Sequence, residues 1–226
     1  MERIRYWVDD SVTMLRLQGK SRLFTKQPDS YTEHNEGKSP IILIPGLFER
    51  WGVLGKIAKS ISRNGHDVFI IPELGDNVFD IETSADIVER FIRINGIPEN
   101  RHIVAHSKGG IIGKKVLNDG YADKMIAIAS PFSGSDFANY FPLSSIQEMT
   151  SRSEKINELM EQSEVNKNIV SIFPVVDNLI PNGSQLKGAE NILVRAKGHH
   201  KILIDKRVIR IVNDKLNLWE EEVRKK

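Results

Sequence analysis

Residues 102–117, HIVAHSKGGIIGKKVL, join a short apolar run to a helical pattern through one serine and two glycines. The run HIVA (102–105) has the length and unbroken apolar character of a strand that is buried on both faces. Ser107 follows it directly, and Gly109 and Gly110 precede a stripe of aliphatic residues. This context is typical of a nucleophile elbow, a sharp strand-to-helix turn that exposes a serine hydroxyl at the carboxyl end of the strand. The alternative interpretation is a serine that only caps the helix.

A turn of this kind needs small residues two positions before and two positions after the serine, because strand and helix approach closely there. Gly109 meets the requirement on one side. On the other side Ala105 stands where the pattern has glycine, and it adds only a methyl group. We also expect the serine itself to adopt a strained backbone conformation.

Apolar runs of similar length recur along the chain and alternate with helical patterns. Strands that alternate with helices predict an α/β fold, with a doubly wound, mainly parallel sheet of about six strands and helices on both faces. The expected strands are residues 41–44, 68–71, 102–105, 125–129, 169–173 and 191–194, and the expected helices lie near 51–63, 82–94, 109–118 and 205–216.

Residues 131–168 separate the fourth and fifth expected strands by far more than a normal crossover. Within them Ser151 and Glu154 have the spacing of a capping box ahead of an apolar stripe at helical intervals. We therefore expect a small helical insertion after the fourth strand, which either covers the site or serves packing alone. We treat residues 1–226 as a single domain.

Residues 1–38 are expected to form an N-terminal helix followed by a polar loop, since residues 25–39 are rich in turn formers. We expect the apolar stripe of this helix to pack on the domain. Nearby arginines leave open a peripheral contact with a membrane surface. The stripe consists of Ile4, Trp7, Val8, Val12 and Leu15.

The composition is that of an ordinary globular protein, with 40% hydrophobic and 27% charged residues. A formal net charge of +2 gives no case for nucleic acid as a partner. The absence of cysteine excludes disulfides, cysteine nucleophiles and thiolate metal sites. No apolar run approaches the roughly 18 residues that a membrane span needs, and the first residues lack the apolar core of a signal peptide. The expected location is cytoplasmic.

A serine hydroxyl becomes a nucleophile only when a neighbouring base takes its proton, so one of the six histidines must lie close to it. His199 and His200 follow the last expected strand, in a loop that opens on the same sheet edge as the elbow. Either could be the base. Adjacent histidines rarely converge on one metal ion, so a metal site is disfavoured. The other four lie in the polar loop, near the starts of strands, or beside the serine but pointing away from it: His34, His66, His102 and His106.

The histidine needs a carboxylate to fix its tautomer and to stabilise the imidazolium. Asp177 follows the strand at 169–173 and gives the chain order Ser, Asp, His that a nucleophile elbow is associated with. Asp76 and Asp80 fit less well because they precede the serine, and Asp136 in the insertion is a weaker rival.

An oxyanion hole requires backbone N–H groups that point at the charge developing on a carbonyl oxygen. One is expected from Lys108, directly after the serine. The other is expected from the loop after the first strand, where Gly46 permits a turn and Leu47 or Phe48 presents its amide.

Taken together, these segments resemble an α/β-hydrolase of the lipase/esterase type, over residues 40 to 215 approximately. The chain is similar to bacterial triacylglycerol lipases and to the lipase domain of the inositol-deacylase family. In those relatives two variable residues and two aliphatics follow the catalytic histidine, which selects His199 over His200, and the first-strand donor is assigned to Leu47. The matching segments are IILIPG (41–46), AHSKGG (105–110), ASPFSGSDFA (129–138), DNLIPNGSQL (177–186) and GHHKIL (198–203).

The resemblance implies a serine hydrolase that cleaves a small-molecule or lipid carboxylic ester without a metal or organic cofactor. Ser107 would be the nucleophile, His199 the base and Asp177 the acid. Two alternatives remain open: an acyltransferase or thioesterase that uses the same residues, and a non-catalytic scaffold that binds an apolar ligand or a partner. Lys108 departs from the family pattern by placing a cation next to the nucleophile.

Overall fold

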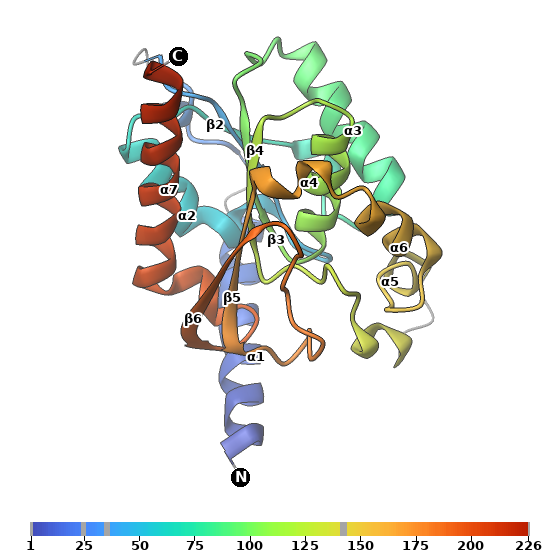
Figure 1. Ribbon diagram of the computed structural model, residues 1–226. Coiled ribbons are helices and arrows are strands. Elements are labelled where there is room, and N and C mark those ends of the chain that lie inside the picture. The colour runs from blue at the N-terminus through green and yellow to red at the C-terminus, as the bar shows by residue number, and fades with distance from the viewer. Residues whose placement is uncertain (1, 24–25, 34–36, 141–143, 226) are drawn as a thin grey trace.

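Six parallel strands form one sheet in the order β2-β1-β3-β4-β5-β6 (Figure 1). The structure is a computed structural model that describes residues 2–23, 26–33, 37–140 and 144–225. Because all neighbouring strands are parallel, their carboxyl ends meet at one edge of the sheet. The strands are β1 (Ile41–Ile44), β2 (Val68–Ile70), β3 (His102–His106), β4 (Lys124–Ile128), β5 (Ile169–Val176) and β6 (Glu190–Lys197).

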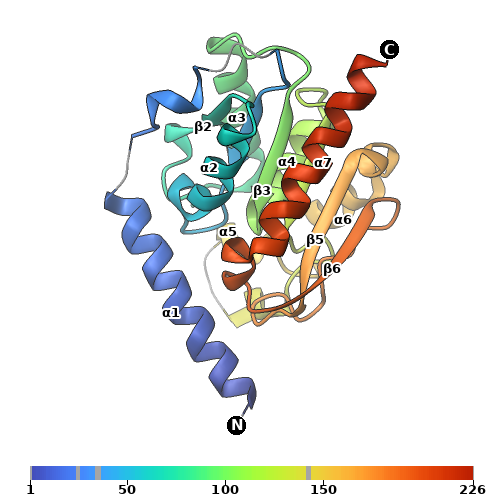
Figure 2. The same ribbon diagram turned by 90° about the vertical axis from the view of Figure 1, so that its left-hand side faces the viewer.

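Helices cover both faces of the sheet. The helices α2 (Gly55–Arg63) and α7 (Lys206–Arg224) lie on one face, and α3 (Ile81–Ile94) and α4 (Lys108–Asn118) lie on the other (Figures 1 and 2). Alternate residues of each central strand enter two separate hydrophobic clusters, as β1 illustrates. Its Ile42 packs with α3 and α4, whereas Leu43 packs with α2 and α7. The α/β fold expected from the sequence is confirmed.

The expected elements agree with the observed ones best where they are buried. β1 has the predicted bounds, whereas β5 and β6 each continue three residues further than their apolar runs. Val175 and Val176 at the end of β5 are exposed, so no unbroken buried run signals this part of the strand. Short 3-10 turns complete the element order: η1 (Asp29–Tyr31), η2 (Trp51–Leu54), η3 (Pro72–Leu74) and η6 (Lys201–Ile204).

Between β4 and β5 the chain forms several short helices. They are η4 (Asp136–Tyr140), α5 (Ser144–Gln147), α6 (Glu154–Glu161) and η5 (Glu164–Asn168).

The predicted capping box of α6 is wrong. The cap is Ser153, whose hydroxyl accepts a hydrogen bond from the Ile156 amide. Ser151 instead donates to Asp136 Oδ1 at 2.6 Å. The hydroxyl of Ser151 is therefore engaged in a contact with Asp136 and does not cap α6.

The N-terminal helix α1 (Glu2–Leu23) packs along the body with one face and extends beyond it at its N-terminal end (Figure 2). The face that packs is largely polar and includes the buried Asp10, Thr13 and Ser21. The apolar stripe that was expected to pack is exposed at Trp7, Val8, Val12 and Leu15, so that prediction is wrong; the side chain of Ile4 lies outside the description. None of the helices in the described ranges is long and apolar enough to cross a membrane.

The backbone at the start of α4 passes very close to the backbone at the end of β1, next to the turn that follows β3. A Cβ atom placed on Gly109 would lie 2.3 Å from the Ile44 carbonyl oxygen and 2.7 Å from that of Pro45. Both neighbours are backbone atoms, which cannot rotate away. The need for a small residue after the serine therefore comes from β1, the strand next to β3.

Replacing Gly109 by alanine is expected to destabilise the fold by about 2–3 kcal/mol, since α4 must move away from β1. The matched control is Gly55→Ala at the first residue of α2, where an added Cβ meets nothing within 4 Å and φ is −57°. That control should be neutral or stabilising by about 0.5–1 kcal/mol. Urea unfolding of the three proteins checks this, and equal free energies of unfolding for the two variants would contradict the crossing argument.

Candidate active site

Ser107 occupies the turn between β3 and α4 with a left-handed backbone, φ 52° and ψ −124°. A non-glycine residue rarely adopts this region, and it does so only where the surroundings impose it. Here the Ser107 amide donates to Ile128 in β4 at 2.9 Å, and its carbonyl accepts from Gly110 at 2.9 Å. The side chain makes no capping hydrogen bond to α4. The expected strain is therefore observed, and Ser107 occupies the N-cap position of α4 without capping it through its hydroxyl.

His199 and Asp177 come together at the carboxyl ends of β5 and β6. The Nδ1 atom of His199 lies 2.9 Å from Asp177 Oδ2 and 3.2 Å from Oδ1. A carboxylate accepts hydrogen bonds, so Nδ1 carries the proton and Nε2 is left with a lone pair. The backbone amide of His199 also donates to the Asn178 side chain at 3.1 Å, which fixes the loop that carries the ring.

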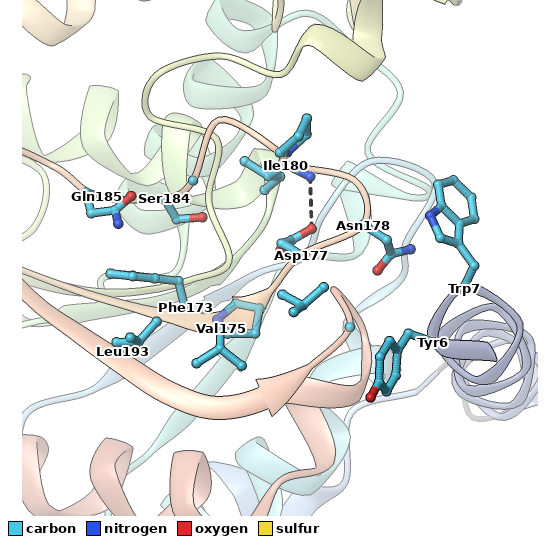
Figure 3. Close-up of a pocket in the computed structure, with 15 residues that line it drawn as sticks. Tyr6, Trp7, Phe173, Val175, Asp177, Asn178, Ile180, Ser184, Gln185 and Leu193 are labelled. Carbon is cyan, nitrogen blue, oxygen red and sulfur yellow. Dashed lines mark hydrogen bonds between the residues drawn. The ribbon is translucent and has the colours of Figure 1, made fainter. Parts of the chain in front are cut away.

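Asp177 is held as a carboxylate although it is buried. Burial alone would raise its pKa, but the adjacent His199 and the hydrogen bonds from His199, Leu179 and Ile180 outweigh burial and lower the pKa below its ordinary value. Both backbone amides lie 2.9 Å from Oδ1. Figure 3 shows the bond from Ile180 as the chain turns away from β5.

One cavity of about 420 Å³ has Ser107, His199 and Leu47 in its wall. Helix α1 contributes Met14 and Gln18 to the same wall. Most of the remaining surface is apolar and comes from the segment after β4 and the segment after β5: Pro131, Ala138, Ile146, Met149, Leu179 and Ile180.

Two backbone amides near Ser107 have the freedom that an oxyanion hole requires. The Gly46 amide is occupied, because it donates to Glu49 Oε2 at 2.8 Å. The next amide, of Leu47, makes no hydrogen bond among the described residues. Lys108 is the first residue of α4, a position where an amide has no acceptor within its helix.

A buried network of two acids and two histidines lies beside these residues. Glu49 Oε2 is 2.8 Å from His106 Nδ1, and Glu49 Oε1 is 3.2 Å from His200 Nε2. On its other side His200 contacts Asp10 of α1 through Nδ1 at 3.2 Å. His106 Nε2 lies 3.2 Å from the carbonyl oxygen of His199, so the network adjoins the loop of that residue.

In this network His200 is positively charged and the two acids beside it are ionised. Burial opposes the charge on His200, but the flanking carboxylates of Asp10 and Glu49 outweigh it and raise the His200 pKa to about 9. In turn His200 lowers the pKa of Asp10 to about 2, and His106 and His200 lower the pKa of Glu49, in both cases against the effect of burial. Burial lowers the pKa of His106, which Glu49 only partly offsets. His200 is thus an imidazolium between two carboxylates.

Sequence reasoning missed Glu49, Asp10 and Asn178. The only local signal for Glu49 is an acid three residues after Gly46, and Asn178 stands directly next to Asp177. Nothing in the sequence links Asp10 to a loop 190 residues away.

The charge of Lys108 has partners away from the cavity. The side chain is buried and does not belong to the cavity wall. Its Nζ donates to the carbonyl oxygens of Asn77, at 3.4 Å, and Phe79, and lies 3.7 Å from Glu148 Oε1. Burial lowers the pKa of Lys108, and Glu148 partly restores it.

The other predicted acids lie outside the cavity wall. Asp76 accepts a hydrogen bond from Arg50 at 3.0 Å. Asp80 caps α3 by accepting from Thr83, and Asp136 accepts from Ser151 of its own segment and from Asn182 of the segment after β5.

Among the other histidines, His66 Nδ1 contacts the Ser39 carbonyl oxygen, and His102 packs edge-on against Trp219 with ring centroids 5.0 Å apart. His34 lies outside the described residues. His200 lines the cavity, but both of its nitrogens face carboxylates. Within the described ranges no three potential ligands gather to hold a metal ion.

A second cleft, of about 510 Å³, lies next to the cavity and is drawn in Figure 3. Tyr6 and Trp7 of α1 stand at one end of it, and Leu193 of β6 stands at the other. Ile180 belongs to the walls of both spaces, so the segment that carries Asp177 runs between them.

The buried imidazolium of His200 predicts how stability depends on pH. Its pKa is about 9 in the folded protein and 6.5 ordinarily, so its contribution is fully present below pH 6.5 and is lost as the pH rises through about 9. This shift corresponds to about 3 kcal/mol. Over that pH range the parent should lose about this much more stability than His200→Gln in urea unfolding. Parallel pH profiles for the two proteins would rule out a charged His200.

Comparison by sequence alone found no matching family and no matching curated protein. Comparison with solved structures gives consistent matches. A mature lipase of Bacillus licheniformis superposes with a TM-score of 0.63 and 16% identity, over 84% of this chain and 96% of that one. Lipase B of Aspergillus fumigatus matches with a TM-score of 0.68 and 19% identity over 84% of this chain; the match spans 55% of that longer chain.

A third structure, the α/β hydrolase enzyme MGS-MChE2 from a lagoon-sediment metagenome, matches over 83% of this chain and 92% of that one. Its TM-score is 0.58 and its identity 16%. At these identities the likeness concerns the arrangement of the backbone. Together with the six parallel strands and their two helical layers, it shows that the protein has the α/β-hydrolase fold of these lipases.

Proposed function

We propose that the protein is a serine hydrolase that cleaves carboxylic esters through an acyl-enzyme. The observation that carries this proposal is a single apolar cavity whose wall holds Ser107 on a strained turn and His199 bonded to the buried Asp177. The lipases of the same fold support the choice of reaction, since esters are what lipases cleave.

In the first half of the reaction His199 Nε2 takes the proton of the Ser107 hydroxyl as its oxygen attacks the acyl carbon. The carbonyl π pair moves onto its oxygen, which becomes the oxyanion. Asp177 stabilises the resulting imidazolium through Nδ1 and remains ionised, in keeping with its lowered pKa. When the tetrahedral intermediate collapses, the bond to the alcohol oxygen breaks, and the imidazolium gives that oxygen its proton.

The oxyanion would be stabilised by the amides of Leu47 and Lys108. The Leu47 amide makes no hydrogen bond within the described chain, and the Lys108 amide lies at the start of a helix. Neither amide therefore has to break a hydrogen bond within its helix or loop before it donates. Donors that are fixed in advance in a water-poor cavity stabilise a developing charge far better than water does. The start of α4 adds the positive end of its dipole.

The second half repeats these steps with water as the nucleophile. His199 takes a proton from water, the hydroxide oxygen attacks the acyl-enzyme carbonyl, and Ser107 leaves as its hydroxyl is reprotonated. The products are a carboxylic acid and free enzyme. The apolar wall formed by Ile146, Met149 and Leu179 favours a substrate with an apolar acyl or alkyl part.

Ser107→Ala should lower the hydrolysis of a short-chain nitrophenyl ester by about 10³-fold or more, since no nucleophile remains. Ser163, an exposed serine of the insertion, provides the control, and Ser163→Ala should keep parental activity. A fluorophosphonate probe should label the peptide that contains Ser107 in the parent and in this control. Full activity of Ser107→Ala, or a label on another residue, would refute the assignment.

Asp177→Asn should lower kcat by about 10³- to 10⁴-fold with a much smaller change in KM, because an amide can favour the wrong tautomer of His199. The matched change is Asp136→Asn at an exposed acid that also follows a strand but lies outside the cavity wall. It should leave kcat within about twofold of the parent. Equal losses in the two variants would mean that Asp177 has no special relation to the base.

A further inference from the structure

Helix α1 carries an apolar face that no part of the described chain covers. We call Val8, Val12, Leu15 and Leu23 the outer stripe; their exposed fractions are 56%, 38%, 64% and 79%. At about 100° per residue these four positions fall on one side of the helix, opposite the side that carries Asp10 and Leu17 toward the body. A soluble helix normally buries such a stripe, so this face indicates an interaction surface.

Cations flank the outer stripe without acids to balance them. Arg16, Lys20 and Arg22 are exposed and form no ion pair among the described residues. Asp9, an exposed acid of the same helix, already pairs with Lys201 at 3.4 Å. The surface therefore combines apolar side chains with net positive charge, the combination by which an interfacial helix binds anionic lipid.

The outer stripe lies next to the residues of α1 that line the cavity. Leu15 is flanked by Met14 and Gln18, which both line the cavity, and Gln18 is only about 60° from Leu15 around the helix. The Gln18 side chain donates to the carbonyl oxygen of Phe48 at 3.3 Å. Phe48 also lines the cavity, and it is 44% exposed. The helix that carries the outer stripe thus also borders the cavity, where the partly exposed Phe48 lies beside it.

We infer that α1 docks on an anionic lipid surface through its outer stripe and its flanking cations. The helix would lie in the plane of the interface, since it is not apolar enough to span a bilayer. Docking would bring the cavity close to lipid, so the inference extends the proposed ester hydrolysis to substrates held in or released from a membrane. The docking itself stands on the surface of α1 and does not depend on catalysis.

A second copy of this chain fits the same surface less well. In an antiparallel pairing of two outer stripes, Arg16 and Lys20 of one copy would approach the same residues of the other. Among the described side chains of α1, the exposed acid Asp9 is already engaged with Lys201. Like charges brought together in this way oppose pairing, whereas anionic lipid would neutralise them.

The test measures cosedimentation with vesicles, and it uses Ser107→Ala protein so that binding is separated from turnover. Vesicles contain phosphatidylcholine alone or mixed with phosphatidylglycerol. We expect binding to the anionic vesicles that weakens as salt is added, since the cations lie at the surface. Protein that stays in the supernatant with anionic vesicles at low salt would overturn the inference.

Two further variants of the Ser107→Ala protein separate the contribution of the apolar stripe from that of the flanking cations. Leu15→Glu should weaken binding at least about tenfold by placing a charge in the outer stripe. Replacing Arg16, Lys20 and Arg22 by glutamine should weaken it about a hundredfold on anionic vesicles, at about fivefold per charge, with little effect on neutral ones. Leu218→Glu changes a residue on α7 that is 45% exposed, and it should bind like its parent.

All of these side chains are exposed, so the variants should keep the parental circular dichroism and melting temperature. If Leu15→Glu does not fold, the glutamine variant decides on its own. Parental binding by either variant would overturn the inference. So would a dimer in sedimentation equilibrium that Leu15→Glu dissociates, because a second copy would then occupy the stripe. Loss of vesicle binding leaves the proposed hydrolysis intact, and retained activity of Ser107→Ala refutes only the hydrolysis.

Discussion

The carboxylate of Glu49 joins the three segments that make up the candidate active site. It accepts hydrogen bonds from the Gly46 amide, from His106 and from His200. These partners lie in the loop after β1, at the end of β3 next to Ser107, and in the loop after β6 next to His199. An unpaired carboxylate in this position would cost several kcal/mol, so the segments can be buried only together. The relative position of the serine, the histidine and the Leu47 amide therefore follows from one buried anion and its donors.

The same constraint explains why the inner face of α1 is polar. His200 needs a second carboxylate to remain an imidazolium in the interior, and Asp10 supplies it from the helix. Asp10 also accepts from the backbone amides of His200 and Lys201, both at 2.9 Å, and so closes the turn that follows His199. The helix is attached largely through charge and hydrogen bonds, with Leu17 packed on the core, and its exposed residues Val8, Val12 and Leu15 lie on the opposite face. Attachment to the body and the proposed contact with a lipid surface thus use different sides of α1.

The features that the sequence could predict are those in which chain order and sheet geometry suffice. Runs such as 41–44 and 102–105 indicated buried parallel strands, and the shared carboxyl edge of those strands brings Asp177 and His199 into contact. The ends of β5 and β6 could not be predicted from unbroken apolar runs, because Val175 and Val176 of β5 are exposed and the buried Ala196 of β6 lies between exposed Arg195 and Lys197. The cap of α6 was predicted wrongly, because the spacing of Ser151 and Glu154 does not reveal that Ser151 binds Asp136 and that Ser153 caps the helix instead.

The network around Glu49 could not be predicted for a different reason. Its pairings cross 57 residues between Glu49 and His106, and 190 between Asp10 and His200. The sequence offers several possible basic partners for each acid, and the actual pairs are defined only in the folded chain. The apolar periodicity of α1 predicts a stripe correctly, but it does not show that this stripe faces away from the body. Periodicity records where apolar residues lie and gives no weight to an acid such as Asp10 whose partners are distant.

Lys108 shows how a charge beside Ser107 can serve structure. A cation at the start of α4 opposes the helix dipole, and burial disfavours it further. Carbonyl groups of the 77–79 loop and Glu148 compensate, and Glu148 also accepts from the Ile81 amide at the start of α3. Helix α4, helix α3 and the insertion are thereby joined at one point. Ile146 and Met149, which flank Glu148, belong to the cavity wall, whereas Lys108 does not. The ammonium group therefore fixes the shape of the cavity, and the wall that meets a substrate remains apolar.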